Sequence, residues 1–223
     1  FINKMDRDIR DPIELLDEIE SILKIKAAPV NWPIGMGSDF LGIYDFFGDV
    51  IYPYVAGQDS KIYSAENILG LASKQAKELL GEGYELFNEE VELVRAASNS
   101  FDKDSFLNGE LTPVFFGSAL MNFGVEEMFA NFIDWAPLPQ SRRAETREVD
   151  AMESDFTGFV FKIQANMDPR HRDRIAFLRI CSGSFERGMK AFHVRIGKQI
   201  KLSEVVSFKA GDREIIERAE TGD

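Results

Sequence analysis

The stretch "FINKMDRD", residues 1–8, joins an apolar segment directly to a polar turn. The first two residues are apolar, as in the interior of a strand, and the polar residues Asn3, Lys4 and Asp6 follow at once. A loop after the carboxyl end of a parallel strand is where open α/β sheets bind ligands. The stretch therefore predicts an α/β sheet whose candidate binding residues are Asn3, Lys4 and Asp6.

A strong helix start follows this loop. Asp11 stands where a side chain caps a helix, and Pro12 occupies the first helical position. Apolar residues then recur at helical spacing, which predicts an amphipathic helix over about 12–24. Strand, polar loop and helix in this order are part of an α/β layer architecture.

Periodicity also predicts the other elements of the first 140 residues. The continuous apolar run "TPVFFGSAL", residues 112–120, is typical of a strand buried on both faces of a parallel sheet. Asp134 and Trp135, with the Phe-rich helix before them, are expected to pack in the core and not to form a binding surface. The remaining predicted elements are a buried strand that runs into a loop at 28–35, a hairpin of strands at 40–46 and 50–55, a short helix near 64–79, a helix at 86–98 and a helix starting at Gly124.

The hydrophobic period changes to two in the last third of the chain. Residues 141–155 follow two prolines and are rich in Ser, Arg, Ala and Glu, so we expect a linker. Residues 156–223 alternate apolar and polar positions between glycines, which predicts an all-β domain and a small barrel.

Charge and composition narrow the class of protein. The chain of 223 residues has a net charge of −12, which argues against binding nucleic acid through its general field. Residues 1–155 hold 13 Lys and Arg against 29 Asp and Glu, whereas residues 156–223 hold 13 against 9. The two parts are therefore expected to meet different partners. The sequence has no apolar run of about 18 residues, so it predicts no membrane span. The single cysteine, Cys181, is expected to be a core residue of a cytoplasmic protein.

The chemistry of the first loop suits a guanine base. The carboxylate of Asp6 is able to accept hydrogen bonds from the ring N–H and the exocyclic amine of guanine, a pair of donors that adenine lacks. The stem of Lys4 is able to lie against the base, and Asn3 offers both a donor and an acceptor. The alternative for these four residues alone is a solvated turn between a strand and a helix.

A second motif favours the guanine site over the solvated turn. The sequence resembles the translational GTPases, whose guanine-specificity loop is N-K-x-D and whose later strand ends in Ser-Ala-Leu or Thr-Ala-Leu. The matching residues are Asn3, Lys4 and Asp6 in the first loop, with Ser118, Ala119 and Leu120 in the second. The resemblance implies that the backbone N–H of Ala119 donates to the guanine carbonyl, while Ser118 and Leu120 shape the loop.

Longer stretches resemble the peptide chain release factor 3 family. They are residues 1–20, 92–102, 110–129 and 155–190, and the weakest match is 38–83. The stretch "MDPRHRDRIAF", residues 167–177, separates this family from elongation factor G and from the tetracycline-protection proteins. Those families have a glycine-containing turn in place of His171-Arg172-Asp173-Arg174.

The resemblance implies a fold and an activity. Residues 1–140 are expected to be the C-terminal part of a P-loop GTPase domain, with an inserted α+β segment at about 38–108. Residues 156–223 are expected to be a β-barrel like domain II of the elongation factors, truncated at its C-terminal end. The whole protein would bind GTP or GDP with Mg²⁺ and hydrolyse GTP.

The phosphate-binding loop, the magnesium-binding Thr and the Asp-x-x-Gly motif of that family do not occur in the sequence. We therefore expect no catalytic or metal residues here, no GTP hydrolysis by this fragment, and no bound cofactor.

The implied partners are the ribosome, through its RNA and proteins, and functionally the class-1 release factors. Arg170, Arg172, Arg174 and Arg179 are candidates for contact with ribosomal RNA phosphates. The alternative is ordinary surface arginines paired with Asp168 and Asp173.

Three other interpretations remain open from the sequence. One is a different ribosomal GTPase, of the elongation factor G or tetracycline-protection type. Another is a binding module without enzymatic activity that docks RNA and protein, and the last is a structural pair of domains without a ligand.

Overall fold

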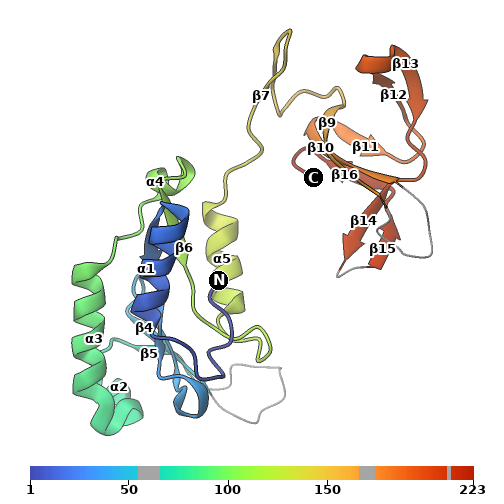
Figure 1. Cartoon of the computed structure of the whole chain (residues 1–223). Coiled ribbons are helices and arrows are strands. Elements are labelled where there is room, and N and C mark those ends of the chain that lie inside the picture. Colours follow the sequence, from blue (N-terminus) through green and yellow to red (C-terminus); the bar gives the residue numbers. More distant parts are fainter. Residues whose placement is uncertain (55–65, 166–173, 210–211) are drawn as a thin grey trace. The chain divides into compact units, whose positions relative to one another are not determined.

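The computed structural model describes residues 1–54, 66–165, 174–209 and 212–223. The chain divides into two compact units, Phe1–Ala136 and Pro137–Asp223. Figure 1 shows helices and strands together in the first unit and strands in the second. The stretch 38–83 includes residues 55–65, which lie outside the described residues.

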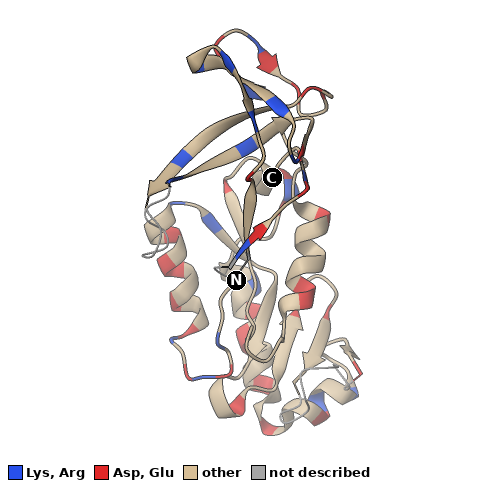
Figure 2. Ribbon diagram, turned by 90° about the vertical axis from the view of Figure 1, so that its right-hand side faces the viewer, with Lys and Arg blue, Asp and Glu red and all other residues tan. Residues whose placement is uncertain are grey.

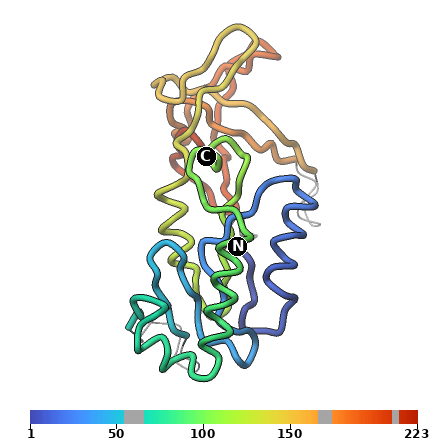
Figure 3. Tube along the Cα trace, turned by 90° about the vertical axis from the view of Figure 1, so that its left-hand side faces the viewer, coloured from blue at the N-terminus to red at the C-terminus, as the bar shows by residue number. Residues whose placement is uncertain are grey.

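The predicted first helix is present as α1, Pro12–Leu23. Asp11 caps its start, since its Oδ1 accepts hydrogen bonds from the N–H of Ile13 at 2.8 Å and of Glu14 at 3.3 Å. The helix ends at Lys24, which adopts a left-handed conformation with φ 57°. In Figure 3 the chain runs from the N label to the start of this helix.

Two strands and the chain start form the parallel part of the first unit. β1, Lys26–Pro29, pairs in parallel with β6, Leu111–Val114. On a continuation of β6, Phe116 forms a parallel bridge with Ile2. The prediction that the apolar run after residue 111 lies in a parallel sheet is confirmed.

The apolar stretch 28–35, predicted as a buried strand that runs into a loop, is divided between two sheets. The buried strand is confirmed, but the part expected to be a loop forms a second strand from Asn31, so that part of the prediction was wrong. The chain leaves β1 and enters β2, Asn31–Ile34, which is the edge of an antiparallel sheet with the order β2, β3, β4, β5. Proline is tolerated on an edge strand, which explains how Pro33 lies inside β2. The predicted hairpin is confirmed as β3, Gly42–Asp45, and β4, Val50–Pro53; β5 is Ile68–Leu69.

The helices of the middle segment bury one apolar face. α3, Tyr84–Ala97, buries Phe87, Val91 and Val94, as the spacing predicts. The helix expected near 64–79 is shorter and later than predicted: β5 is followed by α2, Lys74–Leu80. Short elements complete the segment: η1 is Gly37–Asp39, η2 is Gly81–Gly83 and α4 is Lys103–Leu107.

The last helix of the first unit, α5, covers Val125–Trp135 and buries none of its residues fully. Trp135 stacks on Phe101 with ring centroids 4.0 Å apart, which agrees with a packing role. Phe129, Phe132 and Ile133 are instead exposed, so the prediction that the Phe-rich helix packs in the core was wrong for these three. Helical spacing identifies an apolar face but not what covers it.

The core of the first unit lies between these elements. Trp32, Tyr44 and Phe116 are its largest fully buried side chains. The ring of Trp32 packs edge-on against that of Phe116, with centroids 5.2 Å apart. The core residue Phe116 precedes Ser118 by two residues on the same strand end.

Among its described residues, the second unit consists of strands and one 3-10 turn, η3, Val194–Ile196, which agrees with the all-β prediction for residues 156–223. Its strands pair antiparallel, two by two, within the described residues. The segment 141–155, expected to be a linker, contains the short pair β7, Arg142–Arg143, and β8, Glu148–Val149. The other pairs are β9, Thr157–Ala165, with β10, Arg174–Ser182; β11, Ser184–Glu186, with β16, Arg218–Glu220; β12, Lys190–His193, with β13, Lys198–Lys201; and β14, Val206–Lys209, with β15, Asp212–Ile215.

The charge division of the sequence is visible on the structure. Figure 2 shows acidic residues along the helices of the first unit and basic residues on strands of the second. Within the described ranges, no helix is long and apolar enough to cross a membrane.

Candidate functional site

The two loops selected from the sequence leave neighbouring parallel strands. The N–H of Ile2 donates to the carbonyl of Phe115 at 2.7 Å, and the N–H of Gly117 donates to the carbonyl of Ile2 at 3.1 Å. Both segments therefore enter their loops at the same edge of the sheet. This is the position at which open α/β sheets bind ligands.

Two side chains of the first loop bind the second loop. Ser118 Oγ donates to Asp6 Oδ1 at 2.5 Å, and the backbone N–H of Ala119 donates to Asn3 Oδ1 at 2.8 Å. Four of the six predicted site residues thus contact one another, across more than 110 residues of sequence.

The first loop is fixed by its own backbone. Asn3 Oδ1 also accepts from the N–H of Lys4 at 2.8 Å, and Lys4 has a left-handed φ of 78°. Met5 is fully buried, its N–H donates to the carbonyl of Gly117, and its carbonyl accepts from Gly37. The side chain of Lys4 is exposed, so its stem is accessible to a ligand.

The second loop closes on itself between residues 118 and 123. Ser118 and Phe123 exchange backbone hydrogen bonds at 2.9 and 2.8 Å, and the N–H of Met121 donates to Ser118 Oγ at 3.3 Å. Ser118 is buried, whereas Leu120 is 75% exposed. Leu120 therefore makes no core contact, and its predicted part in shaping the loop has no packing support in the structure.

Asp6 retains capacity for further hydrogen bonds. Its side chain is 18% exposed, and its Oδ2 lies 3.9 Å from Nε of the exposed Arg7. An ionised carboxylate accepts about four hydrogen bonds, and Ser118 supplies one of them. Asp6 is therefore able to accept two donors from a base edge.

The N–H of Ala119 is already used by Asn3. A base carbonyl that accepts from this N–H must share it in a three-centre hydrogen bond or displace the amide of Asn3. Asn3 thus holds the loop in the form seen here and is the side chain whose rotation would admit a ligand.

Sequence reasoning missed Asn31, which contacts the same strand end. Its side chain is 2% exposed and binds both backbone polar groups of Phe116. The available signal was a polar residue inside the apolar stretch "APVNWPIG". A buried polar side chain is informative because burial is costly unless the group is hydrogen-bonded.

A second missed cluster connects the β3–β4 hairpin with α3. The hydroxyl of Tyr44 donates to Asp49 Oδ1 at 2.8 Å, and Arg95 donates to the Tyr44 hydroxyl at 2.6 Å. Burial and the hydrogen bond to Asp49 raise the pKa of Tyr44. Hydrogen bonds from the N–H of Leu71 and from Tyr44 lower the pKa of Asp49. The cluster joins the hairpin to α3 and therefore has a structural role.

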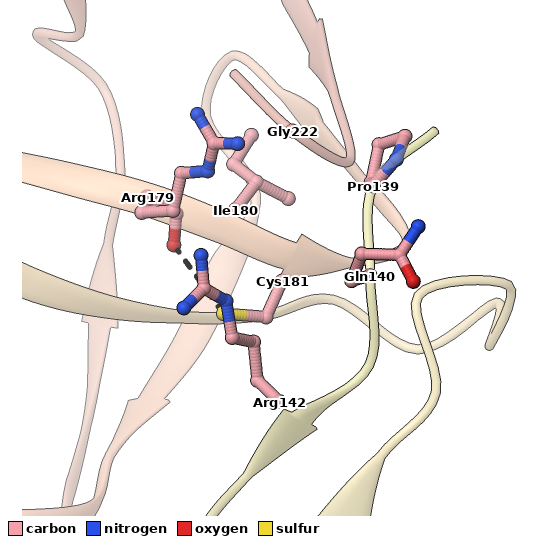
Figure 4. A pocket seen from close by; sticks show the side chains of 7 residues that line it. All are labelled: Pro139, Gln140, Arg142, Arg179, Ile180, Cys181 and Gly222. Carbon is pink, nitrogen blue, oxygen red and sulfur yellow. Dashed lines mark hydrogen bonds between the residues drawn. The ribbon is translucent and has the colours of Figure 1, made fainter. Parts of the chain in front are cut away.

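The candidate RNA-contacting arginines are only partly described. Arg170 and Arg172, with Asp168 and Asp173, lie outside the described residues. Arg174 is exposed at the start of β10, and Arg179 is half-buried. Arg179, Arg142 and the buried Cys181 lie around a small hollow in the second unit, which Figure 4 shows with its other lining residues. In the described part of the chain, no three His, Cys, Asp or Glu side chains gather as metal ligands would.

Comparison with known proteins relates the second unit to translation factors. Residues 155–223 match the family model of elongation factor G domain 2. This match supports a relation to the elongation-factor superfamily, the translational GTPases, and a β-barrel-like second domain.

A solved structure of a protein from Thermus thermophilus resembles the chain over 99% of its length, with a TM-score of 0.60 and 20% sequence identity. At this identity the likeness shows the fold. The chain spans 32% of the length of that structure.

Proposed function

We propose that this chain is part of a translational GTPase of the release factor 3 type, and that its two joined loops bind the guanine base of GTP or GDP. The observation that carries the proposal is the pair of hydrogen bonds from Ser118 to Asp6 and from Ala119 to Asn3. The match of residues 155–223 to elongation factor G domain 2 supports the same superfamily.

The base would be read by groups of both loops. Asp6 accepts the ring N–H and exocyclic amine of guanine, and the N–H of Ala119 donates to the guanine carbonyl. Lys4 lies along the base, and Leu120 remains at the rim. Adenine offers no matching pair of donors to Asp6, so the site discriminates between the two purines.

The phosphates and Mg²⁺ would be held by parts of a longer protein. The sequence contains no G-x-x-x-x-G-K-[ST] string. Most of the affinity for a triphosphate comes from such a loop and its metal ion. We therefore assign GTP hydrolysis to the longer protein and only weak base recognition to this chain.

The biological role rests on the resemblance to release factor 3. In this proposal the GTP-bound protein acts in the cytoplasm on the ribosome and promotes dissociation of class-1 release factors. The triphosphate form would favour one ribosome state, so nucleotide binding shifts a population. The basic residues of the second unit, Arg174 and Arg179 among the described ones, would face ribosomal RNA.

The test uses the full-length protein. Ribosomes stalled at a stop codon with labelled class-1 release factor are mixed with the protein and GTP. We expect faster dissociation of the factor with GTP than with ATP or with no nucleotide. A protein that hydrolyses GTP on ribosomes but leaves this dissociation unchanged would not be of the release factor 3 type.

The second candidate is another ribosomal GTPase, of the elongation factor G or tetracycline-protection type. It is favoured by the family model itself, which is that of elongation factor G. Translocation of messenger RNA, or release of tetracycline from ribosomes, distinguishes it in the same preparation. A module without enzymatic activity is the third candidate, and it predicts no ribosome-stimulated GTP hydrolysis.

A further inference from the structure

The neighbouring strand β1 ends its pairing with β6 just before the candidate guanine loop. From there, a side chain forms the hydrogen bonds to the β6 continuation. Backbone pairing between β1 and β6 reaches Val30, whose N–H donates to the carbonyl of Val114 at 2.9 Å. The next residue already belongs to β2, where it pairs with Asp45 in the other sheet. Phe116 would therefore have no backbone partner on this side.

Asn31 supplies that partner through its side chain. The N–H of Phe116 donates to Asn31 Oδ1 at 2.7 Å, and Asn31 Nδ2 donates to the carbonyl of Phe116 at 3.1 Å. The amide thus presents one donor and one acceptor to the strand, as a peptide group does. Removing it would leave two buried backbone groups unpaired, which is costly.

Ile2 holds the opposite side of the same strand segment through Phe115 and Gly117. The segment is therefore clamped between the strand that leads into the first loop and the amide of Asn31. Ser118 follows Phe116 by two residues and Ala119 by three. The loop is closely packed here, since a Cβ at Gly117 would lie 2.4 Å from the carbonyl oxygen of Phe123. A displacement of Phe116 would therefore also displace Ser118 and Ala119.

We infer that Asn31 is a positioning residue for guanine binding. It fixes the strand end so that Ser118 meets Asp6 and the N–H of Ala119 is held at Asn3 Oδ1, where a base carbonyl would share or replace that hydrogen bond. The inference rests on the proposed function, because it assigns the purpose of the loop to nucleotide recognition. Asn31 itself is buried and does not touch the base.

The first measurement needs no nucleotide. Amide hydrogen exchange is followed at Gly117, Ser118 and Ala119 in this 223-residue chain. In Asn31→Ala we expect exchange at these amides to be at least about tenfold faster. The matched control is Asn99→Ala, because Asn99 donates to the carbonyl of Ala27 at 3.3 Å on β1, away from the loop. Equal exchange in the two variants would overturn the inference.

The second measurement is titration of the full-length protein with GDP in the presence of Mg²⁺, at a temperature where each variant is fully folded by circular dichroism. Asn31→Ala is expected to raise the Kd for GDP about tenfold, and Asn99→Ala to leave it unchanged. If Asn31→Ala does not fold, Asn31→Ser replaces it, because a hydroxyl does not span both groups of Phe116.

Asp6→Asn separates the two possible failures. If Asp6→Asn weakens GDP binding and the Asn31 variants do not, the inference on Asn31 is wrong and the proposed function stands. If neither change affects GDP, the proposed function is wrong, and the exchange experiment alone decides whether Asn31 positions the loop.

Discussion

Ser118 and Asp6 lie 112 residues apart in sequence, and the hydroxyl of Ser118 donates to the Asp6 carboxylate at 2.5 Å. The same hydroxyl accepts from the N–H of Met121 at 3.3 Å. Ser118 therefore links the orientation of Asp6 to the conformation of the second loop. A base that binds Asp6 would find its carboxylate already oriented.

Replacing Ser118 tests this link. Ser118→Ala removes the hydrogen bond to Asp6, and we expect GDP affinity of the full-length protein to fall by about 1 kcal/mol, roughly fivefold. Calorimetric titration measures it. The control is Ser182→Ala, which removes a buried hydroxyl bound to the carbonyl of Asp155 in the second unit. Unchanged affinity in Ser118→Ala would show that Asp6 does not depend on this contact.

Gly117 is predicted to tolerate no side chain. A Cβ there would lie 2.4 Å from the carbonyl of Phe123 and 2.9 Å from the ring of Phe1. We expect Gly117→Ala to lower the free energy of unfolding by about 1 to 3 kcal/mol because the backbone must shift. Urea unfolding followed by tryptophan fluorescence reports on the first unit, which holds Trp32 and Trp135.

Gly83→Ala is the matched control for this change, since a Cβ at Gly83 meets no atom within 4 Å. Equal unfolding curves for Gly117→Ala and Gly83→Ala would contradict the packing described for the loop.

The first unit is predicted to lose stability in acid through Asp49. Hydrogen bonds from Leu71 and Tyr44 lower the pKa of Asp49 below its ordinary value of 3.8. A carboxyl whose pKa is lower in the folded state stabilises the fold above its unfolded pKa, and this contribution is lost as pH falls through the folded pKa. We therefore expect Asp49→Asn to reduce the difference in urea midpoint between about pH 6 and about pH 3.

The effect of Asp49 is expected to be small because the group is largely exposed. Asp17→Asn, at an exposed position of α1, is the control and should leave the difference in midpoints as in the wild type. If Asp49→Asn behaves like Asp17→Asn, the cluster of Tyr44, Asp49 and Arg95 contributes no pH dependence.

The features predicted correctly from the sequence depend on short-range chemistry. Asp11 and Pro12 specify the start of α1 by themselves, and the β3–β4 hairpin follows from two short runs rich in Phe, Ile, Tyr and Val on either side of residues 47–49. Both motifs follow apolar strands, and the resemblance to the translational GTPases assigned them to one site; the hydrogen bonds between the two loops are a finding of the structure.

The features that were missed depend on distant partners. Asn31 stands out as a polar residue in an apolar stretch, but its partner Phe116 lies 85 positions away, so the sequence does not show which backbone groups its amide binds. The division of 28–35 between two sheets has the same cause, because the chain stops pairing with β6 at Val30 and pairs with β3 from Asn31. The exposure of Phe129 and Phe132 on α5 was not predicted because periodicity shows an apolar face without showing whether anything covers it.

Asp6→Asn in the full-length protein tests whether the Asp6 carboxylate recognises guanine. An amide N–H would face a guanine donor, so GTP affinity should fall by roughly 2 to 4 kcal/mol. Xanthosine triphosphate carries an oxygen in place of the exocyclic amine and should bind the variant better than GTP does. Calorimetric titration with both nucleotides gives the result. Wild-type affinity for GTP in Asp6→Asn, with no gain for xanthosine triphosphate, would contradict the account.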